Sequence, residues 1–269
     1  MTKGTKPSVE VGQNYVSTTG EEYQVVEYKG SVKGVTIKFL SSGNTMVCSA
    51  KEVRNGSVKN PLQKSVFGVA CFGEGPWKAK VNGKFLPEYQ LWIGLMTRIY
   101  HEPTLKDHPT YRTASICKEW HNFQNFAEWC QGQIGFLSKQ ANGKSFALDK
   151  DLLIPNNKVY SPATCCFLPN HINVALKGRQ SKKGEEIPSG VYWHNASSSY
   201  VAAANKNGQQ FHLGCFGTVE QAKKVFRKFK TEYLRELAEE YKDRISVAAY
   251  EALRNINMDE RLTYSITEV

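Results

Sequence analysis

The 269-residue sequence lacks features that mark several large classes of proteins. It contains no run of about 18 apolar residues, so we expect no membrane-spanning helix. The first residues, MTKGTKPSVEVG, have no apolar core of a signal peptide, and we therefore expect a cytoplasmic protein. The seven cysteines are odd in number and form no Cys-x-x-Cys pair, which favours reduced, mostly buried thiols over a disulfide framework or a zinc site.

The sequence carries an excess of basic residues: 35 lysines and arginines against 25 acidic residues give a net charge of +10 at pH 7. This charge favours a polyanionic partner, with nucleic acid as the first candidate, although a basic surface without a partner has the same composition. The content of 41% hydrophobic and 22% charged residues is that of a folded protein. The length favours two or three domains.

Residues 1–60 are predicted to form a small β-rich, barrel-like module. Apolar and polar residues alternate in EYQVVEYKG and KGVTIKFLSSGN, and Gly or Asn separates these segments. Val35, Ile37 and Phe39 should share one face of a strand. Residues 61–88 show little periodicity and many Gly, Pro, Asn and Lys residues, which indicates a linker or loop.

Residues 89–187 are predicted to form a domain that contains both helices and strands. YQLWIGLMTRIYH has helical periodicity. A second helix is predicted where Trp120, Phe123, Phe126 and Trp129 recur every three or four residues. We expect this aromatic stripe to lie in a core rather than to form a cofactor site.

Residues 188–243 show the most regular pattern in the chain, which is three short strands separated by turns and then one long helix. Thr218 followed by Gln221 predicts the start of the helix, because this spacing is that of a capping box. The apolar face of this helix, about seven turns long, is formed by Ala222, Phe226, Phe229, Tyr233, Leu237 and Tyr241. Residues 244–269 are predicted to form a short terminal helix and a tail.

The alternation of side chains along the three strands predicts one sheet face that the helix leaves free, because one helix covers one face of a sheet. Phe211 and Leu213 should face the helix. The free face carries no acidic residue, and its small side chains permit close approach to another surface. It is formed by Tyr192, His194, Val201, Ala203, Asn205, Gln210 and His212.

The segments GVYWH, YVAAA and HLGCF, with a Thr-started helix that contains EQA, resemble the Apetala-two/ethylene-response-factor DNA-binding domain of phage and mobile-element proteins. The resemblance covers about residues 188–240. In that family the sheet enters the major groove, so the resemblance implies that the free face contacts double-stranded DNA. The face lacks the arginines of the family, which form bidentate hydrogen bonds to guanine. Their absence implies limited base specificity. The expected phosphate contacts are Lys206, Lys223, Lys224 and Arg227.

Three segments of the middle third, YQLWIGLMTRIYH, PTYRTASICKEWHNFQNFAEW and FALDKDLLIPNNKVYSPATCCFLPNHIN, together resemble phage proteins related to HNH homing endonucleases. The resemblance covers about residues 89–176 and implies two strands and a helix around a divalent ion, Mg²⁺ or Mn²⁺. The implied metal ligands are Asp149, Asp151 and Asn173. Lys150 stands where the family has its general-base histidine, and a lysine carries its proton at neutral pH, so His171 is the remaining candidate base.

Two interpretations of this segment follow from its residues. In the first, the domain is an active metal-dependent nuclease. In the second, cleavage has been lost and the domain only grips DNA. Asp149 and Asp151 then cap turns or pair with Lys150 and Lys158.

Together these patterns predict an α+β, multi-domain protein with a small N-terminal β module and an HNH-like α+β centre. Its C-terminal domain is a three-stranded antiparallel sheet packed on one long helix. The predicted function is DNA binding in the cytoplasm, that of a bacterial host if a phage encodes the chain. The alternatives are a homing endonuclease that nicks or cuts DNA, and a module for protein interaction or for antagonism of host defence.

Overall fold

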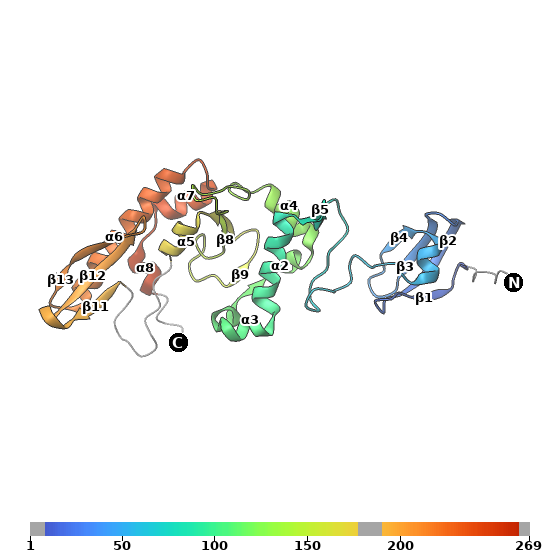
Figure 1. Ribbon diagram of the computed structural model, residues 1–269, viewed down its shortest axis with the longest axis horizontal. Coiled ribbons are helices and arrows are strands. Elements are labelled where there is room, and N and C mark those ends of the chain that lie inside the picture. Colours follow the sequence, from blue (N-terminus) through green and yellow to red (C-terminus); the bar gives the residue numbers. More distant parts are fainter. Residues whose placement is uncertain (1–8, 177–189, 264–269) are drawn as a thin grey trace. The chain divides into compact units, whose positions relative to one another are not determined.

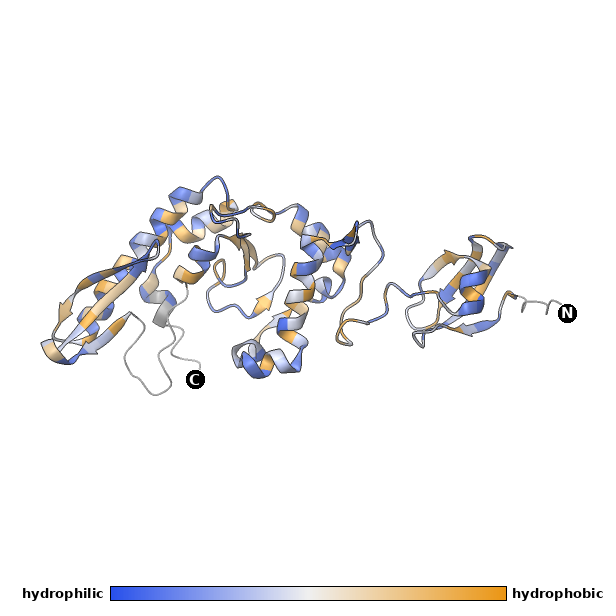
Figure 2. Ribbon diagram, in the orientation of Figure 1, coloured by the Kyte–Doolittle hydropathy of each residue, from blue (hydrophilic) through white to orange (hydrophobic). Residues whose placement is uncertain are grey.

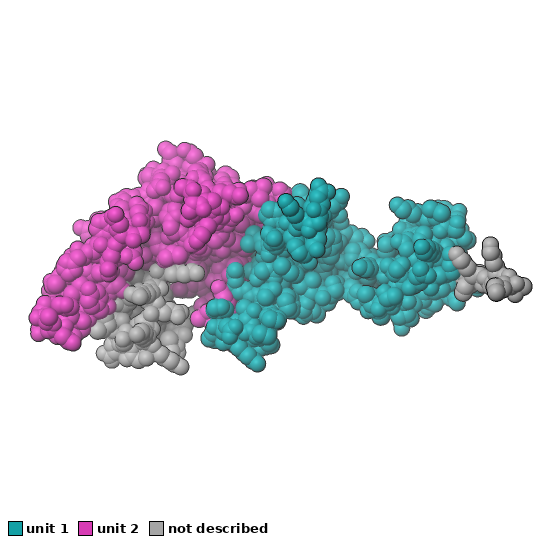
Figure 3. Space-filling view, viewed as in Figure 1, with its two compact units in different colours: residues 1–109, 118–128 teal, residues 110–117, 129–269 magenta. Residues whose placement is uncertain are grey.

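The computed structural model describes residues 9–176 and 190–263, and it has the predicted α+β composition (Figure 1). The chain forms two compact units (Figure 3), Met1–Pro109 with Lys118–Glu128 and Thr110–Cys117 with Trp129–Val269. The region 89–187, predicted as one central domain, is thereby distributed over both units. In the described ranges no helix is long and apolar enough to cross a membrane.

The N-terminal module is a four-stranded antiparallel sheet in the order β1-β2-β3-β4 followed by a short helix. Its elements are β1 (Asn14–Val16), β2 (Glu22–Gly30), β3 (Gly34–Phe39), β4 (Thr45–Cys48) and α1 (Ala50–Asn55). The predicted shared face is confirmed, since Val35, Ile37 and Phe39 are all fully buried in one core. Ser49 begins α1 with a capping box that involves Glu52.

The rest of the first unit is a small hairpin and a group of helices. Its elements are β5 (Lys80–Val81), β6 (Lys84–Phe85), α2 (Pro87–Tyr100), α3 (Glu102–Asp107), the 3-10 helix η2 (Lys118–His121) and the start of α4 (Phe123–Gln131). Trp120, Phe123 and Phe126 are buried, which confirms these three residues of the aromatic stripe as core, whereas Trp129 is half-buried. The predicted linker is fixed to this group, because the Gln124 side chain accepts a hydrogen bond from Trp77 N at 2.9 Å.

The second unit contains an antiparallel pair of short strands and a short helix. The antiparallel strands are β8 (Ala147–Asp149) and β10 (Cys166–Leu168), and α5 (Asn170–Leu176) comes directly after them. The 3-10 helix η1 (Pro109–Thr113) leads to a second, parallel pair, β7 (Ser115–Ile116) and β9 (Val159–Tyr160). The buried side chains of Phe167, Leu168 and Ile172 form the centre of this region.

The C-terminal part is the predicted three-stranded antiparallel sheet on one long helix. Its elements are β11 (Val191–His194), the 3-10 helix η3 (Asn195–Ser197), β12 (Ser199–Lys206), β13 (Gln209–Phe216), α6 (Val219–Tyr241), α7 (Val247–Arg254) and α8 (Met258–Thr263). Thr218 caps α6 by accepting a hydrogen bond from Gln221 N at 3.3 Å. The β12–β13 turn places Asn207 and Gly208 at φ 53° and 80°, the conformation that an Asn-Gly hairpin turn adopts.

The helix α6 is amphipathic, with hydrophilic and hydrophobic residues alternating along its length (Figure 2). Its apolar side packs on the sheet in a small core of Val191, Ala202, Ala204, Ala222 and Phe226. All six residues of the predicted stripe lie on this side, and Phe229 is the one that stays half-buried. The same side also contains a lysine, Lys230, which the stripe did not include.

Candidate nucleic-acid interface and polar network

The strand register brings the predicted free-face residues together on the side of the sheet opposite α6. Across the strands, Tyr192 pairs with Val201, Ala203 pairs with His212, and Asn205 pairs with Gln210. Directly paired residues project to the same face of an antiparallel sheet. The face is therefore continuous over all three strands.

A β-bulge changes the membership of this face. The register shifts between Ala202 and Ala203. Val201 therefore pairs with Cys215 rather than with Gly214, which an unshifted register would place opposite it. Gly214 lies at the bulge with φ 133°, a conformation that favours glycine. Cys215, which simple alternation assigns to the helix side, is therefore exposed on the free face, with its Sγ 3.7 Å from His212 Nε2.

Two predicted interface residues are placed differently from the expectation. Val201 is only 3% exposed, because it lies in the central strand between Tyr192 and Cys215, and it offers no contact surface. Lys206 belongs to the helix side, where its ammonium group pairs with the Glu236 carboxylate and lies 5.5 Å from the ring centre of Tyr233. Lys206 is therefore already neutralised and does not belong to the free face.

The remaining residues of the face form an exposed polar surface without negative charge. Tyr192 is 46% exposed, and His194, Asn205, Gln210 and His212 are exposed as well. From Gly190 to Val219 the chain contains no aspartate or glutamate. The strands thus contribute hydrogen-bond donors and acceptors but no carboxylate that would repel an anion.

The other predicted phosphate contacts lie on α6 and differ in availability. Lys223 pairs with Glu220 at 2.6 Å, and Arg227 pairs with Asp259 at 3.3 Å. Lys224 is exposed. Only Lys224 of the three cations thus lies on the surface without an ion pair among the described side chains.

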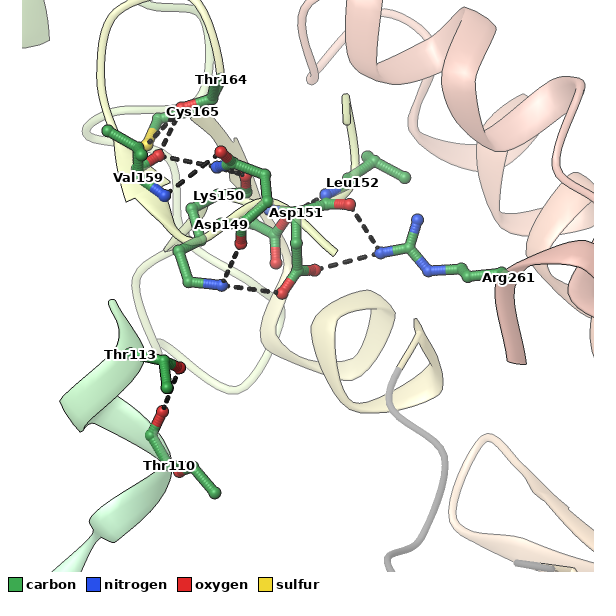
Figure 4. A network of polar contacts seen from close by, with 11 residues as sticks. Thr110, Thr113, Asp149, Lys150, Asp151, Leu152, Val159, Thr164, Cys165 and Arg261 are labelled. Atoms are coloured by element: carbon green, nitrogen blue, oxygen red, sulfur yellow. Dashed lines mark hydrogen bonds and ion pairs between the residues drawn. The ribbon is translucent and has the colours of Figure 1, made fainter. Parts of the chain in front are cut away.

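Asp149, the first predicted metal ligand, is buried at the end of β8 and holds the following turn (Figure 4). Its Oδ1 accepts hydrogen bonds from Asp151 N at 3.1 Å and from Leu152 N at 2.7 Å. Burial raises the pKa of the Asp149 carboxyl, and the nearby Asp151 carboxylate raises it further. The two backbone hydrogen bonds and Arg261 act in the opposite direction.

The ammonium group of Lys150 is held by two acceptors. Its Nζ donates to Asp151 Oδ2 at 3.1 Å and to the Asn157 carbonyl at 2.8 Å (Figure 4). Asn157 in turn donates from Nδ2 to the Lys150 carbonyl at 2.6 Å. Asp151 is shared with Arg261 of α8, which donates to Asp151 Oδ1 at 3.0 Å and to its carbonyl at 2.8 Å.

The structure does not bring all predicted catalytic residues into one site. His171 Nδ1 lies 3.2 Å from Gln140 Oε1, and its ring packs on Tyr241 with centres 5.2 Å apart. Burial lowers the pKa of His171. Asn173 is half-exposed, and neither residue has a hydrogen bond to the carboxylates of Asp149 or Asp151 among the described residues.

Asp149 and Asp151 make turn-capping and ion-pair contacts of the kind that the second interpretation assigns to these two residues. Asp149 caps a turn and Asp151 pairs with Lys150, but the second partner of Asp151 is Arg261 rather than Lys158. Over residues 9–176 and 190–263, no group of three or more histidine, cysteine, aspartate or glutamate side chains is arranged to hold a metal ion. The seven cysteines form no disulfide bond in the described ranges, in which all seven lie, and Cys48, Cys130, Cys165 and Cys166 are buried.

Comparisons of the chain with known protein families, with curated proteins and with solved structures find no match. The two family resemblances therefore rest on the motifs quoted above.

Proposed function

We propose that the protein binds duplex DNA through the free face of the β11–β13 sheet. The observation that carries this proposal is an exposed, continuous and acid-free sheet face in a protein of net charge +10. A DNA surface carries one negative charge per about 1.7 Å of its axis, so a protein surface without carboxylates approaches it at low electrostatic cost.

The dimensions of the sheet suit the major groove. Three strands at about 4.8 Å spacing span about 10 Å between the outer strands, and the groove is about 12 Å wide. The half-buried Ala203 at the centre of the face lets the backbone approach the base edges. Asn205 and Gln210, paired across β12 and β13, carry amides of the kind that bind adenine in a bidentate manner.

The experiment is fluorescence anisotropy with the full chain and labelled duplex DNA over a series of salt concentrations. The test variant is His194→Glu with His212→Glu, which places two carboxylates on the face. The control is Gln131→Glu with Asn142→Asp, which adds the same charge at exposed positions elsewhere in the second unit. We expect the test variant to lose at least about tenfold in affinity and the control to keep it. Absence of salt-dependent binding at about 50 mM salt would overturn the proposal.

Metal-dependent DNA cleavage is the alternative function. The observation that favours it is the antiparallel pair β8 and β10 with the helix α5 after it. The contacts of Lys150 and Asp151 give these residues structural roles, so we expect no cleavage by this network. The test is incubation of supercoiled plasmid with the protein and Mg²⁺ or Mn²⁺. Nicked product that disappears in the Asp149→Asn variant would instead establish the nuclease.

A further inference from the structure

Lys230 lies in an unusual position on α6, because it belongs to the side of the helix that faces the core. It follows Phe226 by four residues and precedes Tyr233 by three, so the three side chains share one helix face. Lys230 is only 8% exposed, and lysine is among the residues that are least often buried without a partner.

No described side chain forms an ion pair or a hydrogen bond with the Lys230 ammonium group. The nearby Lys206 is different, since Glu236 of the same helix neutralises it. Burial lowers the pKa of Lys230 to about 8, and no carboxylate of the described residues offsets this effect. The fold therefore keeps a cation in a place where it destabilises the protein, and such positions are enriched in functional sites.

The side chain of Lys230 lines an open cavity of about 1100 Å³ within the second unit. The strand β12 and the following turn contribute Asn205 and Asn207, and β13 contributes Gln210. Asn207 is fixed in place, because Tyr233 donates a hydrogen bond from its hydroxyl to Asn207 Oδ1 at 2.9 Å. Lys230 is thus accompanied by amide groups and an aromatic ring.

The cavity has two chemically different ends. Glu240 and His171 also line it, and Glu240 follows Lys230 by ten residues on α6. Ten residues of an α-helix extend about 15 Å, so the carboxylate is too far away to neutralise Lys230. One end is therefore cationic and the other end carries a carboxylate and an imidazole, with the rings of Tyr233 and Tyr241 on the same helix.

We propose that this cavity is a binding site for a phosphate-bearing molecule of mononucleotide size, with the phosphate at Lys230. The cavity is much larger than an inorganic phosphate, and its volume is slightly above the range of about 300–1,000 Å³ that is usual for ligand sites. The amide groups can form hydrogen bonds to a nucleobase, and the aromatic rings can stack on it. The Glu240 carboxylate can accept hydrogen bonds from hydroxyl or amino groups at the far end of the cavity. The proposal does not rest on the DNA binding proposed above.

The phosphate group has two sources, a free nucleotide or a nucleotide unit of DNA. Ala203, Asn205 and Gln210 line the cavity and also belong to the proposed DNA face, so a DNA strand on that face has access to the cavity. The chemistry at Lys230 is the same in both cases, and the two arms of the experiment separate them.

The first arm is isothermal titration of the full chain with nucleoside monophosphates, the matching nucleosides and inorganic phosphate, without DNA. The variant is Lys230→Met, and the control is Lys228→Met, whose side chain is 77% exposed on the same helix. We expect at least one monophosphate to bind about tenfold more tightly than its nucleoside, and Lys230→Met to remove this difference. Lys228→Met should retain it.

The second arm measures the binding of duplex and single-stranded DNA to the same three proteins. If free monophosphates do not bind but Lys230→Met weakens DNA binding by about tenfold and Lys228→Met does not, the nucleotide unit belongs to DNA. If Lys230→Met changes neither kind of binding, the proposal is overturned. Chemical unfolding of Lys230→Met shows whether the variant is folded. If it is folded, a loss of binding reports on the site and not on misfolding.

Discussion

Two lysines of this protein, the half-buried Lys150 and the buried Lys230, differ in how their charge is compensated. Lys150 is surrounded by the Asp151 carboxylate and the Asn157 carbonyl, and Arg261 completes the network on the other side of Asp151. Lys230 is 8% exposed and has no such partner among the described residues. A buried charge with partners can be explained by structure alone, whereas a buried charge without them requires another explanation.

The contrast bears on the two interpretations of the segment around Lys150. The side chains of Lys150 and Asp151 connect β8, the following loop and α8. The helix α6 was expected to supply phosphate contacts through Lys223, Lys224 and Arg227, but not through Lys230 on its buried side. Substitutions at Asp149, Lys230 and Asp151 test this contrast.

The largest effect is expected at Asp149. Asp149→Ala leaves the buried amide of Leu152 and the partly buried amide of Asp151 without an acceptor and should lower the free energy of unfolding by about 4 kcal/mol in total. Asp149→Asn keeps an oxygen for both amides and removes a buried charge, so it should cost far less. Urea denaturation of the three proteins measures both effects. Equal losses in the two variants would contradict the structural role.

The second effect is expected at Lys230 and depends on pH. The native pKa of Lys230 is about 8, below its ordinary value, so between pH 8 and 10 the unfolded chain binds more protons than the native protein. Stability should therefore rise with pH through this window. Below it, the buried charge costs about 3 kcal/mol.

Lys230→Met should consequently be more stable than the original chain at pH 7, and this advantage should shrink as the pH approaches 10. Urea denaturation at several pH values gives the difference. Other groups titrate equally in both proteins and cancel in the comparison. A constant difference, or a variant that is less stable at pH 7, would show that Lys230 has a partner in solution.

The third effect is expected at Asp151, which neutralises Lys150 and Arg261. Asp151→Ala leaves two largely buried cations beside each other and should lower the free energy of unfolding by about 2 kcal/mol, since the partial exposure of Asp151 reduces the penalty. Asp243→Ala removes an exposed carboxylate with the same change in charge and serves as the control. Similar stability of the two variants would remove Asp151 from the network.

The sequence predicted the fold of the C-terminal part well because its signals are local. Alternation placed the strands, Thr218 marked the start of α6, and the spacing of apolar residues identified its buried side. What alternation missed depends on geometry that is not periodic. The bulge at Gly214 moves Cys215 to the free face, and the central position of Val201 buries it.

The polar network could be predicted only in part for a different reason. The two backbone amides that donate to Asp149 belong to Asp151 and Leu152, which follow it closely in the chain. A turn capped by Asp149 was one of the predicted alternatives. Arg261 lies 110 residues beyond Asp151, and no local pattern joins them. Lys230, in contrast, was visible in the sequence, because it stands four residues after Phe226 on a face of otherwise apolar residues.

The smallest effect is expected at Cys215. It tests whether the free face binds DNA, whereas the preceding predictions test stability. Cys215 is the exposed cysteine of the chain, whereas Cys48, Cys130, Cys165 and Cys166 are buried and should react slowly. If the free face binds DNA, saturating duplex DNA should slow the alkylation of Cys215 by maleimide by about tenfold, which mass spectrometry measures at the peptide level.

The half-buried Cys71 in the first unit is an internal control, because DNA on the sheet should leave its reaction unchanged. A Cys215→Ser variant should keep the fold and the affinity for DNA, since the thiol contacts only His212 among the described polar groups. Equal protection of Cys71 and Cys215 would indicate nonspecific coating of the protein. Protection of neither, at DNA concentrations that saturate the anisotropy signal, would locate the DNA on another surface.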